Sequence, residues 1–127
     1  MNLRRLSLIL ALAVTLSSHV HASFHLWDIT EVYSNSDGSQ QFVEMFSPSN
    51  GEQFISGHSL NSNNSSYEFL TNTPSGTAGK FLLIATGPIA GVNPDYVIPA
   101  NFFSLTNDHV NFAGVSNLAW TTLPVMG

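Results

Sequence analysis

Two short alternating segments, separated by a turn, constrain the fold of this chain most strongly. The segments are residues 27–33 and 41–46, and residues 34–40 between them are rich in Ser, Asn, Asp and Gly. Side chains alternate between the two faces of a β-strand. A β-hairpin is therefore predicted, in which Gly38 takes a positive φ at little steric cost.

Each segment of this hairpin carries one acid among apolar neighbours. With a period of two, Glu31 shares a face with Ile29 and Tyr33, and Glu44 lies between two phenylalanines. If residues 36–39 form a four-residue turn, Glu31 is directly opposite Glu44. Two like charges in that position are unfavourable.

Several arrangements would neutralise Glu31 and Glu44. We expect each carboxylate to accept hydrogen bonds from the backbone amides of a neighbouring loop, because buried polar groups are normally satisfied by such partners. Calcium is a weaker alternative, since the chain has no dense Asp/Asn loop such as D-x-D-x-D-G. A proton shared between the two carboxylates is another alternative. As a function, a glycosidase pair has less support, because its two acids must line an open cleft at a set separation.

The rest of the chain also has the pattern of an all-β protein. Aromatic and β-branched segments are short and separated by Gly, Pro, Asn and Ser clusters, with no convincing amphipathic helix after residue 22. The segment 80–86 is the most apolar, which predicts a central strand covered on both sides. Residues 107–108 are expected to form a turn. The other expected strands are residues 53–60, where Gly57 indicates a bulge or a close backbone approach, and residues 67–70, 96–98, 109–113 and 118–123.

The first 22 residues have the three parts of a secretory signal peptide. Two arginines near the start precede an apolar stretch over residues 6–16, and Val-His-Ala at residues 20–22 forms a small-residue cleavage site. The apolar stretch is shorter than the roughly 20 residues of a membrane span, and no later segment is long and apolar enough to span. We expect cleavage before Ser23 and a secreted, periplasmic or cell-surface product of one domain, residues 23–127.

The composition of that product excludes several classes of partner. Lys80 is its only Lys or Arg, against eight Asp and Glu, so its formal charge is −7. Nucleic-acid binding requires several cations that neutralise phosphates, and an anionic membrane is disfavoured for the same reason. The chain has no cysteine, so its stability must come from the core or from bound ions. Removing 22 of 127 residues leaves enough for one core.

Three segments in order carry a resemblance to a known family. They are Ile-Thr-Glu-Val at residues 29–32, Phe-Val-Glu-Met-Phe-Ser-Pro at residues 42–48, and Ile-Ser-Gly-His-Ser-Leu at residues 55–60. The pattern resembles the lamin-tail domain, an immunoglobulin-like antiparallel β-sandwich of nuclear lamins and many exported bacterial proteins. His58 departs from it, because the family usually has Trp there. The motif residues are Glu31, Phe42, Glu44, Pro48, Gly57 and Leu60.

The resemblance implies an exported, non-catalytic structural or binding module with a protein or polysaccharide ligand and no cofactor. It also implies a closing strand, which is not clear before Gly127, so either the chain continues past Gly127 or the sandwich lacks a strand at one edge. Two other functions remain open. One is a small secreted hydrolase, or an accessory domain of one, that uses Glu31 with Glu44 or Asp108 with His109. The other is a surface assembly subunit that pairs through an edge strand.

The histidines give little support to a metal or catalytic site. His25, His58 and His109 are far apart in sequence and lack the spacing of zinc ligands. Asp108 and His109, in a serine-rich chain, suggest a triad, but there is no G-x-S-x-G motif. We expect them to be turn and surface residues.

The aromatic residues allow one further hypothesis. Flat aromatic faces suit sugar rings, so a carbohydrate platform is an alternative to ordinary packing in the core or at its rim, which we favour. The candidates for that platform are Trp27, Tyr33, Tyr67, Tyr96 and Trp120.

Overall fold

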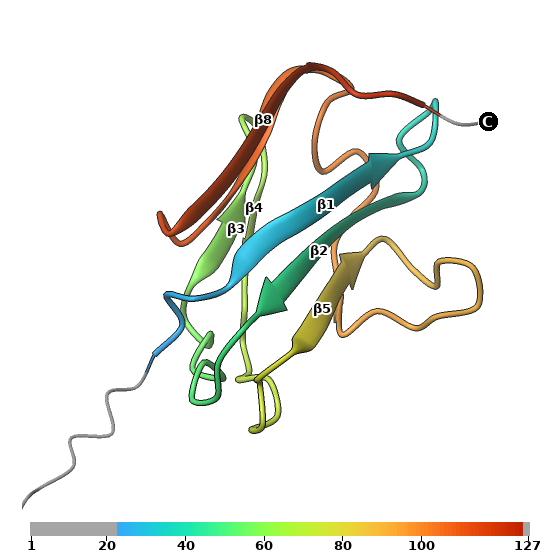
Figure 1. The fold of residues 1–127 in the computed structure, drawn as a ribbon. Helices are drawn as coiled ribbons and strands as arrows, with labels where there is room; N and C mark the ends of the chain where they lie inside the picture. Colours follow the sequence, from blue (N-terminus) through green and yellow to red (C-terminus); the bar gives the residue numbers. More distant parts are fainter. Residues whose placement is uncertain (1–22, 126–127) are drawn as a thin grey trace, which may run out of the picture.

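Residues 23–125 fold into two four-stranded β-sheets that face each other (Figure 1). The structure is a computed structural model that describes these residues; the expected signal peptide, residues 1–22, lies outside them. The described part contains no α-helix, which confirms the all-β prediction. The strands are β1 (Asp28–Ser34), β2 (Gln41–Ser47), β3 (Ser59–Asn61), β4 (Ser66–Glu68), β5 (Lys80–Ala85), β6 (Tyr96–Val97), β7 (Thr106–Phe112) and β8 (Ser116–Thr122).

The two sheets have the strand orders β1-β2-β5-β6 and β4-β3-β7-β8, and we call them the first and the second sheet. Neighbouring strands are antiparallel, except that β6 runs parallel to β5. A parallel pair needs a crossover connection. Residues 86–95, between β5 and β6, form this connection. Residues 116–122, near the end of the chain, form β8 along β7.

The hydrophobic core lies between the two sheets. Along β2, buried residues alternate with half-buried ones, and Val43 and Met45 point inward. Opposite them, Val110 and Phe112 of β7 are fully buried. Burying a side chain of this size stabilises the fold by about 1.5–3 kcal/mol. The other buried apolar residues of the core cluster are Trp27, Ile29, Ile55, Leu60, Phe69, Leu82, Ile84, Ile98, Phe102, Phe103 and Leu123.

Two predicted local structures are wrong. Residues 53–58 do not continue the strand, because His58 N donates to Ile55 O (3.0 Å) in a turn and Gly57, with φ 83°, donates its N–H to Phe69 O (2.7 Å). Residues 107–108 belong to β7 instead of a turn. Asn107 has φ 50° there, a conformation that Asn tolerates better than most residues.

A buried amide ties the segment before β7 to the first sheet. The side chain of Gln41, at the start of β2, donates to Phe103 O (2.8 Å) and accepts a hydrogen bond from Phe103 N (3.3 Å). It also donates to Ser34 Oγ (3.1 Å). Leaving a buried amide without hydrogen-bond partners destabilises the folded state. The Gln41 side chain therefore holds its three partners in one arrangement, which rigidifies the core.

The two sides of the sandwich are closed differently. On one side β1 approaches β8, where Ser116 Oγ donates to Asp28 Oδ1 (2.7 Å) and accepts from Ile29 N (3.0 Å). On the other side the rings of Phe69 and Tyr96 pack edge to face with centroids 4.9 Å apart. No helix of the described residues is long and apolar enough to cross a membrane.

The aromatic closure predicts a loss of stability at alkaline pH. Burial raises the pKa of Tyr96, whose hydroxyl donates to Thr71 O (3.0 Å), and burial also raises the pKa of Tyr67. The folded state therefore favours the neutral phenols. Their contribution is complete below the unfolded pKa of about 10 and is lost as pH rises through the higher folded pKa.

We expect urea unfolding at pH 9 to 11 to show this loss in the wild type and a smaller loss in Tyr96→Phe. At neutral pH that variant should be less stable by about 1 kcal/mol, because it lacks the hydrogen bond to Thr71. Tyr33→Phe is the control, since Tyr33 lies on the opposite face of the first sheet. An equal alkaline loss in wild type, Tyr96→Phe and Tyr67→Phe would contradict the account.

Candidate functional site

The two acids of the first hairpin face each other across β1 and β2. Glu31 is opposite Glu44, and Asn35 N donates to Gln40 O (2.9 Å) at the turn. The predicted register is therefore confirmed. Glu31 is exposed and Glu44 is half-buried, so both carboxylates lie on the side of the sheet that is turned away from the core.

A β-bulge at Thr30 places these acids on the outer side. Ile29 is opposite Met45 and both are buried, whereas Glu31, beyond the extra residue, is opposite Glu44. One inserted residue reverses the direction of the following side chains. The prediction that Ile29 and Glu31 share a face is therefore wrong. Glu31 is still opposite Glu44, because the bulge lies outside the part of the ladder between these two residues and the turn.

Neither acid of this pair anchors a loop. Glu44 Oε1 accepts a hydrogen bond from Thr30 Oγ1 (3.0 Å) on the neighbouring strand, and within residues 23–125 no hydrogen bond reaches the carboxylate of Glu31. The loop-anchoring prediction is wrong for both residues. Two other acids have that role.

Glu52 anchors the segment before β1, although no sequence pattern had singled it out. Its side chain is buried, with the residue 3% exposed, and accepts hydrogen bonds from Ser23 Oγ (2.8 and 3.0 Å) and Leu26 N (3.2 Å). Its backbone oxygen accepts from the indole of Trp27 (2.6 Å). One acid therefore holds both the incoming chain and the largest core residue.

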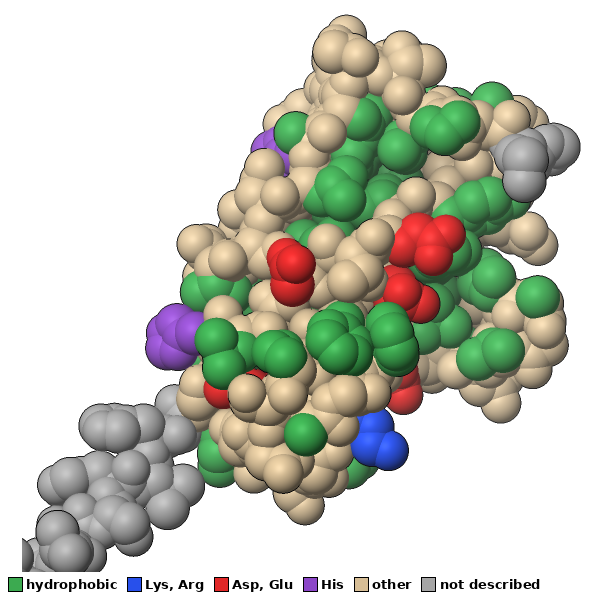
Figure 2. Space-filling model, in the orientation of Figure 1, with side chains coloured by type: hydrophobic (Ala, Val, Ile, Leu, Met, Phe, Trp, Pro, Cys, Tyr) green, Lys and Arg blue, Asp and Glu red, His purple; other side chains and the backbone are tan. Residues whose placement is uncertain are grey.

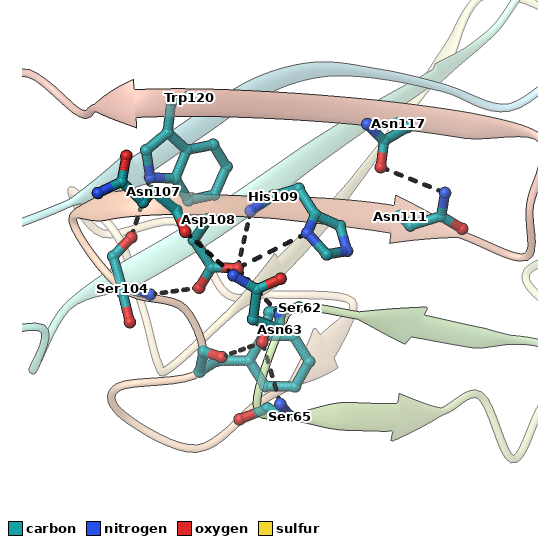
Figure 3. A network of polar contacts seen from close by, with 11 residues as sticks. Ser62, Asn63, Ser65, Ser104, Asn107, Asp108, His109, Asn111, Asn117 and Trp120 are labelled. Carbon is teal, nitrogen blue, oxygen red and sulfur yellow. Dashed lines mark hydrogen bonds and ion pairs between the residues drawn. The ribbon is translucent and has the colours of Figure 1, made fainter.

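Asp108 anchors the loops at the opposite end of the second sheet (Figure 3). The residue is 5% exposed, and its carboxylate accepts hydrogen bonds from the backbone N–H groups of Asn63 (2.9 Å), Ser104 (2.8 Å) and His109 (2.7 Å). Its oxygens are thus occupied by three amides. These hydrogen bonds give the carboxylate of Asp108 a structural role, which is to hold the two loops against the start of β7.

The triad hypothesis for Asp108 and His109 has no serine in place. His109 Nδ1 lies 3.8 Å from Asp108 Oδ1, beyond hydrogen-bond distance. Ser62 Oγ donates to Phe102 O (2.6 Å) and accepts from Ser65 N (3.1 Å), so it is engaged elsewhere. Among residues 23–125 no hydrogen bond joins His109 to a serine hydroxyl. We therefore base no function on this group.

The outer face of the first sheet, defined by Tyr33, Phe42, Phe46, Phe81 and Leu83, is apolar. Tyr33 stacks on Phe42 with ring centroids 5.2 Å apart, and Phe46 lies 4.9 Å from Phe81. Phe81 is 59% exposed. The prediction that residues 80–86 are covered on both sides is therefore wrong for Phe81 and Leu83, whereas Ala85, on the same outer side of β5, is fully buried.

Acidic side chains lie among these apolar ones. Figure 2 shows both kinds side by side over β1, β2 and β5, with the blue atoms of a basic side chain at the lower edge. Lys80 is the only Lys or Arg of residues 23–125. This part of the surface combines exposed aromatic rings with uncompensated negative charge.

A groove of about 390 Å³ lies on this outer face beside the loop between β5 and β6. Its apolar lining comes from Phe42, Leu83, Ile89 and Val92, and Glu44 and Asp95 add carboxylates. The loop has a defined shape, because Ile89 and Val92 exchange two backbone hydrogen bonds of 2.9 Å around a tight turn. The groove is thus a built concavity of apolar walls with two acids.

A second cavity of about 300 Å³ lies on the other side of β5. Residues 73–77, Lys80 and the edge of Trp27 line it, and Thr and Ser side chains make it more polar. It shares Phe81, Leu82 and Asp95 with the outer groove. The two cavities therefore flank one edge of β5.

The aromatic residues of the carbohydrate hypothesis do not form one platform. Trp27 is 1% exposed, Tyr33 stacks on Phe42, and Trp120 packs edge to face on Phe103 at 5.4 Å. Tyr67 and Tyr96 meet edge to face at 6.4 Å. These residues pack in the core, at its rim or on the outer face, as the favoured interpretation expected.

The remaining motif residues lie in ordinary structural positions. Pro48 is exposed just after β2, Gly57 takes a positive φ in a turn, and Leu60 of β3 is fully buried. Phe42 and Glu44 are on the outer face. Within residues 23–125 no three His, Cys, Asp or Glu side chains are grouped as a metal site would require, so the calcium hypothesis rests on the pair of acids alone.

Comparison of the chain with models of protein families, with curated proteins and with solved structures gives no match. The site is therefore interpreted from its own geometry.

The opposed acids predict a stabilising substitution. Changing Glu31 to Lys replaces a like-charge pair by an opposite-charge pair, which should raise the free energy of unfolding by about 0.5–1 kcal/mol. The gain should shrink with added salt, since the pair is on the surface. Thermal unfolding of wild type and Glu31→Lys at low and high salt measures this.

Glu68→Lys is the matched control. Glu68 is an exposed acid on β4 and is opposite Ser59, so this variant makes the same change of net charge without an opposing acid. If both variants stabilise the protein equally, the effect is one of net charge, and the pairwise account is wrong.

Proposed function

We propose that this protein is an exported, non-catalytic binding module, a lamin-tail-like sandwich of immunoglobulin type, that holds a positively charged protein partner on the outer face of its first sheet. The observation that carries the proposal is the exposed face itself, on which Phe81 is 59% exposed and Glu31 is opposite Glu44. Contiguous exposed apolar surface in a soluble domain marks an interaction site.

The export part of the proposal is supported by the pattern of residues 1–22. The lamin-tail part is supported by the order of the three motif segments. Their residues have distinct places in the sandwich, since Leu60 is in the core and Glu44 is on the outer face.

The charge of the partner follows from complementarity. Glu31, Glu44 and Asp95 lie on or beside the outer face, and residues 23–127 carry a formal charge of −7. A field of one sign steers an oppositely charged partner and discourages partners of the same sign. Long Lys and Arg side chains also suit the groove, because their aliphatic stems pack on apolar walls while the charged ends reach carboxylates.

A protein fits this surface better than a polysaccharide. The groove is lined by aliphatic Leu83, Ile89 and Val92, and Tyr33 uses one face of its ring to stack on Phe42. Phe81 also lines the groove, but two of the three polar side chains there, Glu44 and Asp95, are carboxylates, which suit a cationic side chain, and the third is Asn93. The partner surface should instead carry Lys or Arg beside apolar residues.

Site-specific photo-cross-linking tests the proposal. A benzophenone amino acid at position 83, on the outer face, should capture a basic partner when the protein is exported by its own cells. The same group at position 119, an exposed residue of β8, is the control and should capture little. The partner, once identified by mass spectrometry, should bind the purified chain with an affinity that falls as salt increases.

The acids supply the second arm of this test. Combining the label at position 83 with Glu31→Lys and Glu44→Lys should remove the adduct. Equal labelling from positions 83 and 119, or an adduct that survives both charge reversals, would overturn the assignment of the outer face.

A further inference from the structure

The pairing of β5 leaves part of one edge open. Thr86 N donates to Gln41 O (3.0 Å) at the end of the β2–β5 ladder. Backbone groups of successive residues point to opposite neighbours along a strand, so Leu82 and Ile84 bond toward β2. Phe81, Leu83 and Ala85 then direct their N–H and C=O groups to the other edge.

Two of these three residues have partners on that edge. Ala85 O accepts a hydrogen bond from Ile98 N (3.0 Å). Leu83 makes two hydrogen bonds with Asp95: Leu83 O accepts from Asp95 N (2.8 Å), and Leu83 N donates to Asp95 Oδ2 (2.8 Å). The ladder with β6 begins at Ile84. No strand of the described residues lies opposite Phe81, so its backbone donor and acceptor face an open edge.

The two cavities flank this open position. The outer groove is reached past Leu83, which points away from the core, and the second cavity past Leu82, which points toward it. An added strand would direct successive side chains to opposite sides of the sheet. One side chain of such a strand would enter the outer groove, and its neighbour would enter the second cavity.

We propose that the partner contributes an extended segment with a Lys or Arg, which adds to β5 as a short strand beside Phe81. This inference rests on the proposed function and specifies how the partner binds. Backbone hydrogen bonds to Phe81 give the affinity, and the two cavities give the sequence preference, as in other cases of strand addition. The Lys or Arg enters the outer groove, and a small polar residue next to it enters the second cavity.

The charges of the two cavities support this assignment of side chains. Glu44 and Asp95 face the outer groove with Phe42 and Leu83 beneath them. Asp95 uses Oδ2 for Leu83, which leaves Oδ1 for a cation. The second cavity instead has Lys80 among hydroxyl groups, so a second basic side chain is disfavoured there.

A random seven-residue peptide library displayed on phage, panned on purified residues 23–127, tests the proposal. We expect enriched peptides to carry Lys or Arg beside a small polar residue in a segment without proline. The best peptide is then synthesised, and its binding to variants is measured by calorimetry. Residues whose backbone amides respond in NMR should include Phe81.

Phe81→Pro and Phe81→Ala form the decisive pair. Both remove the aromatic ring, but Pro also removes the edge N–H, and proline is tolerated where that N–H faces solvent. We expect Phe81→Pro to bind about tenfold more weakly than Phe81→Ala, in line with the loss of a hydrogen bond to a bound strand. Glu44→Gln should weaken a basic peptide but not its Lys-to-Gln analogue.

The outcomes separate this inference from the proposed function. If the peptide is basic and sensitive to Glu44→Gln but binds Phe81→Pro and Phe81→Ala equally, the outer face binds its partner without strand addition. If panning yields no basic peptide, or one insensitive to Glu44→Gln, both the strand addition and the acidic binding face are overturned. Circular dichroism of each variant shows that it is folded.

A different observation carries a second inference, at the buried carboxylate of Glu52. Its described partners are the neutral donors Ser23 Oγ and Leu26 N, and no ion pair with it is found within residues 23–125. A buried carboxylate is normally paired with a cation or fully hydrogen-bonded. Ser23 is also the first residue after the expected cleavage site.

We infer that export processing creates the cation for Glu52. Hydrolysis of the peptide bond between Ala22 and Ser23 by a signal peptidase adds one water, which leaves a carboxylate on Ala22 and an α-ammonium group on Ser23. The hydroxyl of Ser23 is 2.8 Å from Glu52 Oε1, and three bonds separate it from the nitrogen, so the ammonium lies within roughly 7 Å of the carboxylate. The mature N-terminus then stabilises the fold.

Three chains test this inference: residues 23–127, the same chain with one added N-terminal Ala, and the same chain acetylated at Ser23. We expect melting temperatures about 5 °C lower for the second and third, as the loss of a partly solvent-screened charge interaction implies for a domain of this size. In a Glu52→Gln background the three chains should melt together. Equal melting temperatures with Glu52 present would overturn the inference.

If Glu52→Gln does not fold, the terminal amine of the wild type decides. An adjacent carboxylate raises the pKa of an amine above its ordinary value of about 7.7–8.0, which NMR titration measures. A terminal pKa at or below that value contradicts the pairing.

Discussion

The pairing of β2 with its two neighbours determines the rest of this structure. Its alternation sends Val43 and Met45 into the core and Phe42, Glu44 and Phe46 to the outer face. The bulge at Thr30 then lets β1 bury Ile29 while keeping Glu31 opposite Glu44. Because one ladder sets both faces, the hydrophobic core and the acidic, apolar surface cannot be changed independently.

The sequence allowed the hairpin register to be predicted, because turn length and a period of two are local properties. It did not reveal which acids hold loops. Glu52 and Asp108 are buried by segments that approach from far along the chain, such as Ser23 at Glu52 and Asn63 at Asp108. A lone acid beside Gly51 or Asn107 has no pattern that distinguishes it from a surface residue.

Most strands were expected at the right places, but their surroundings were not. The apolar run of β5 indicated burial on both faces, whereas Phe81 is exposed, because within residues 23–125 no strand lies over this part of the outer side of the first sheet. Composition reports that a segment is apolar and does not report what lies against it. The sequence of an apolar strand is therefore the same whether its second face is buried in a core or exposed as an interaction surface.

The parallel pairing of β6 connects the fold to the proposed binding mode. A parallel neighbour must be reached by a crossover, and the loop that makes it supplies Ile89, Val92 and Asp95 to the wall of the outer groove. The same short strand covers β5 at Ile84 and Ala85 alone. One topological feature thus produces both the groove and the open backbone position beside it. A longer β6 would satisfy Phe81 from within the chain and remove the position at which a partner strand is proposed to add.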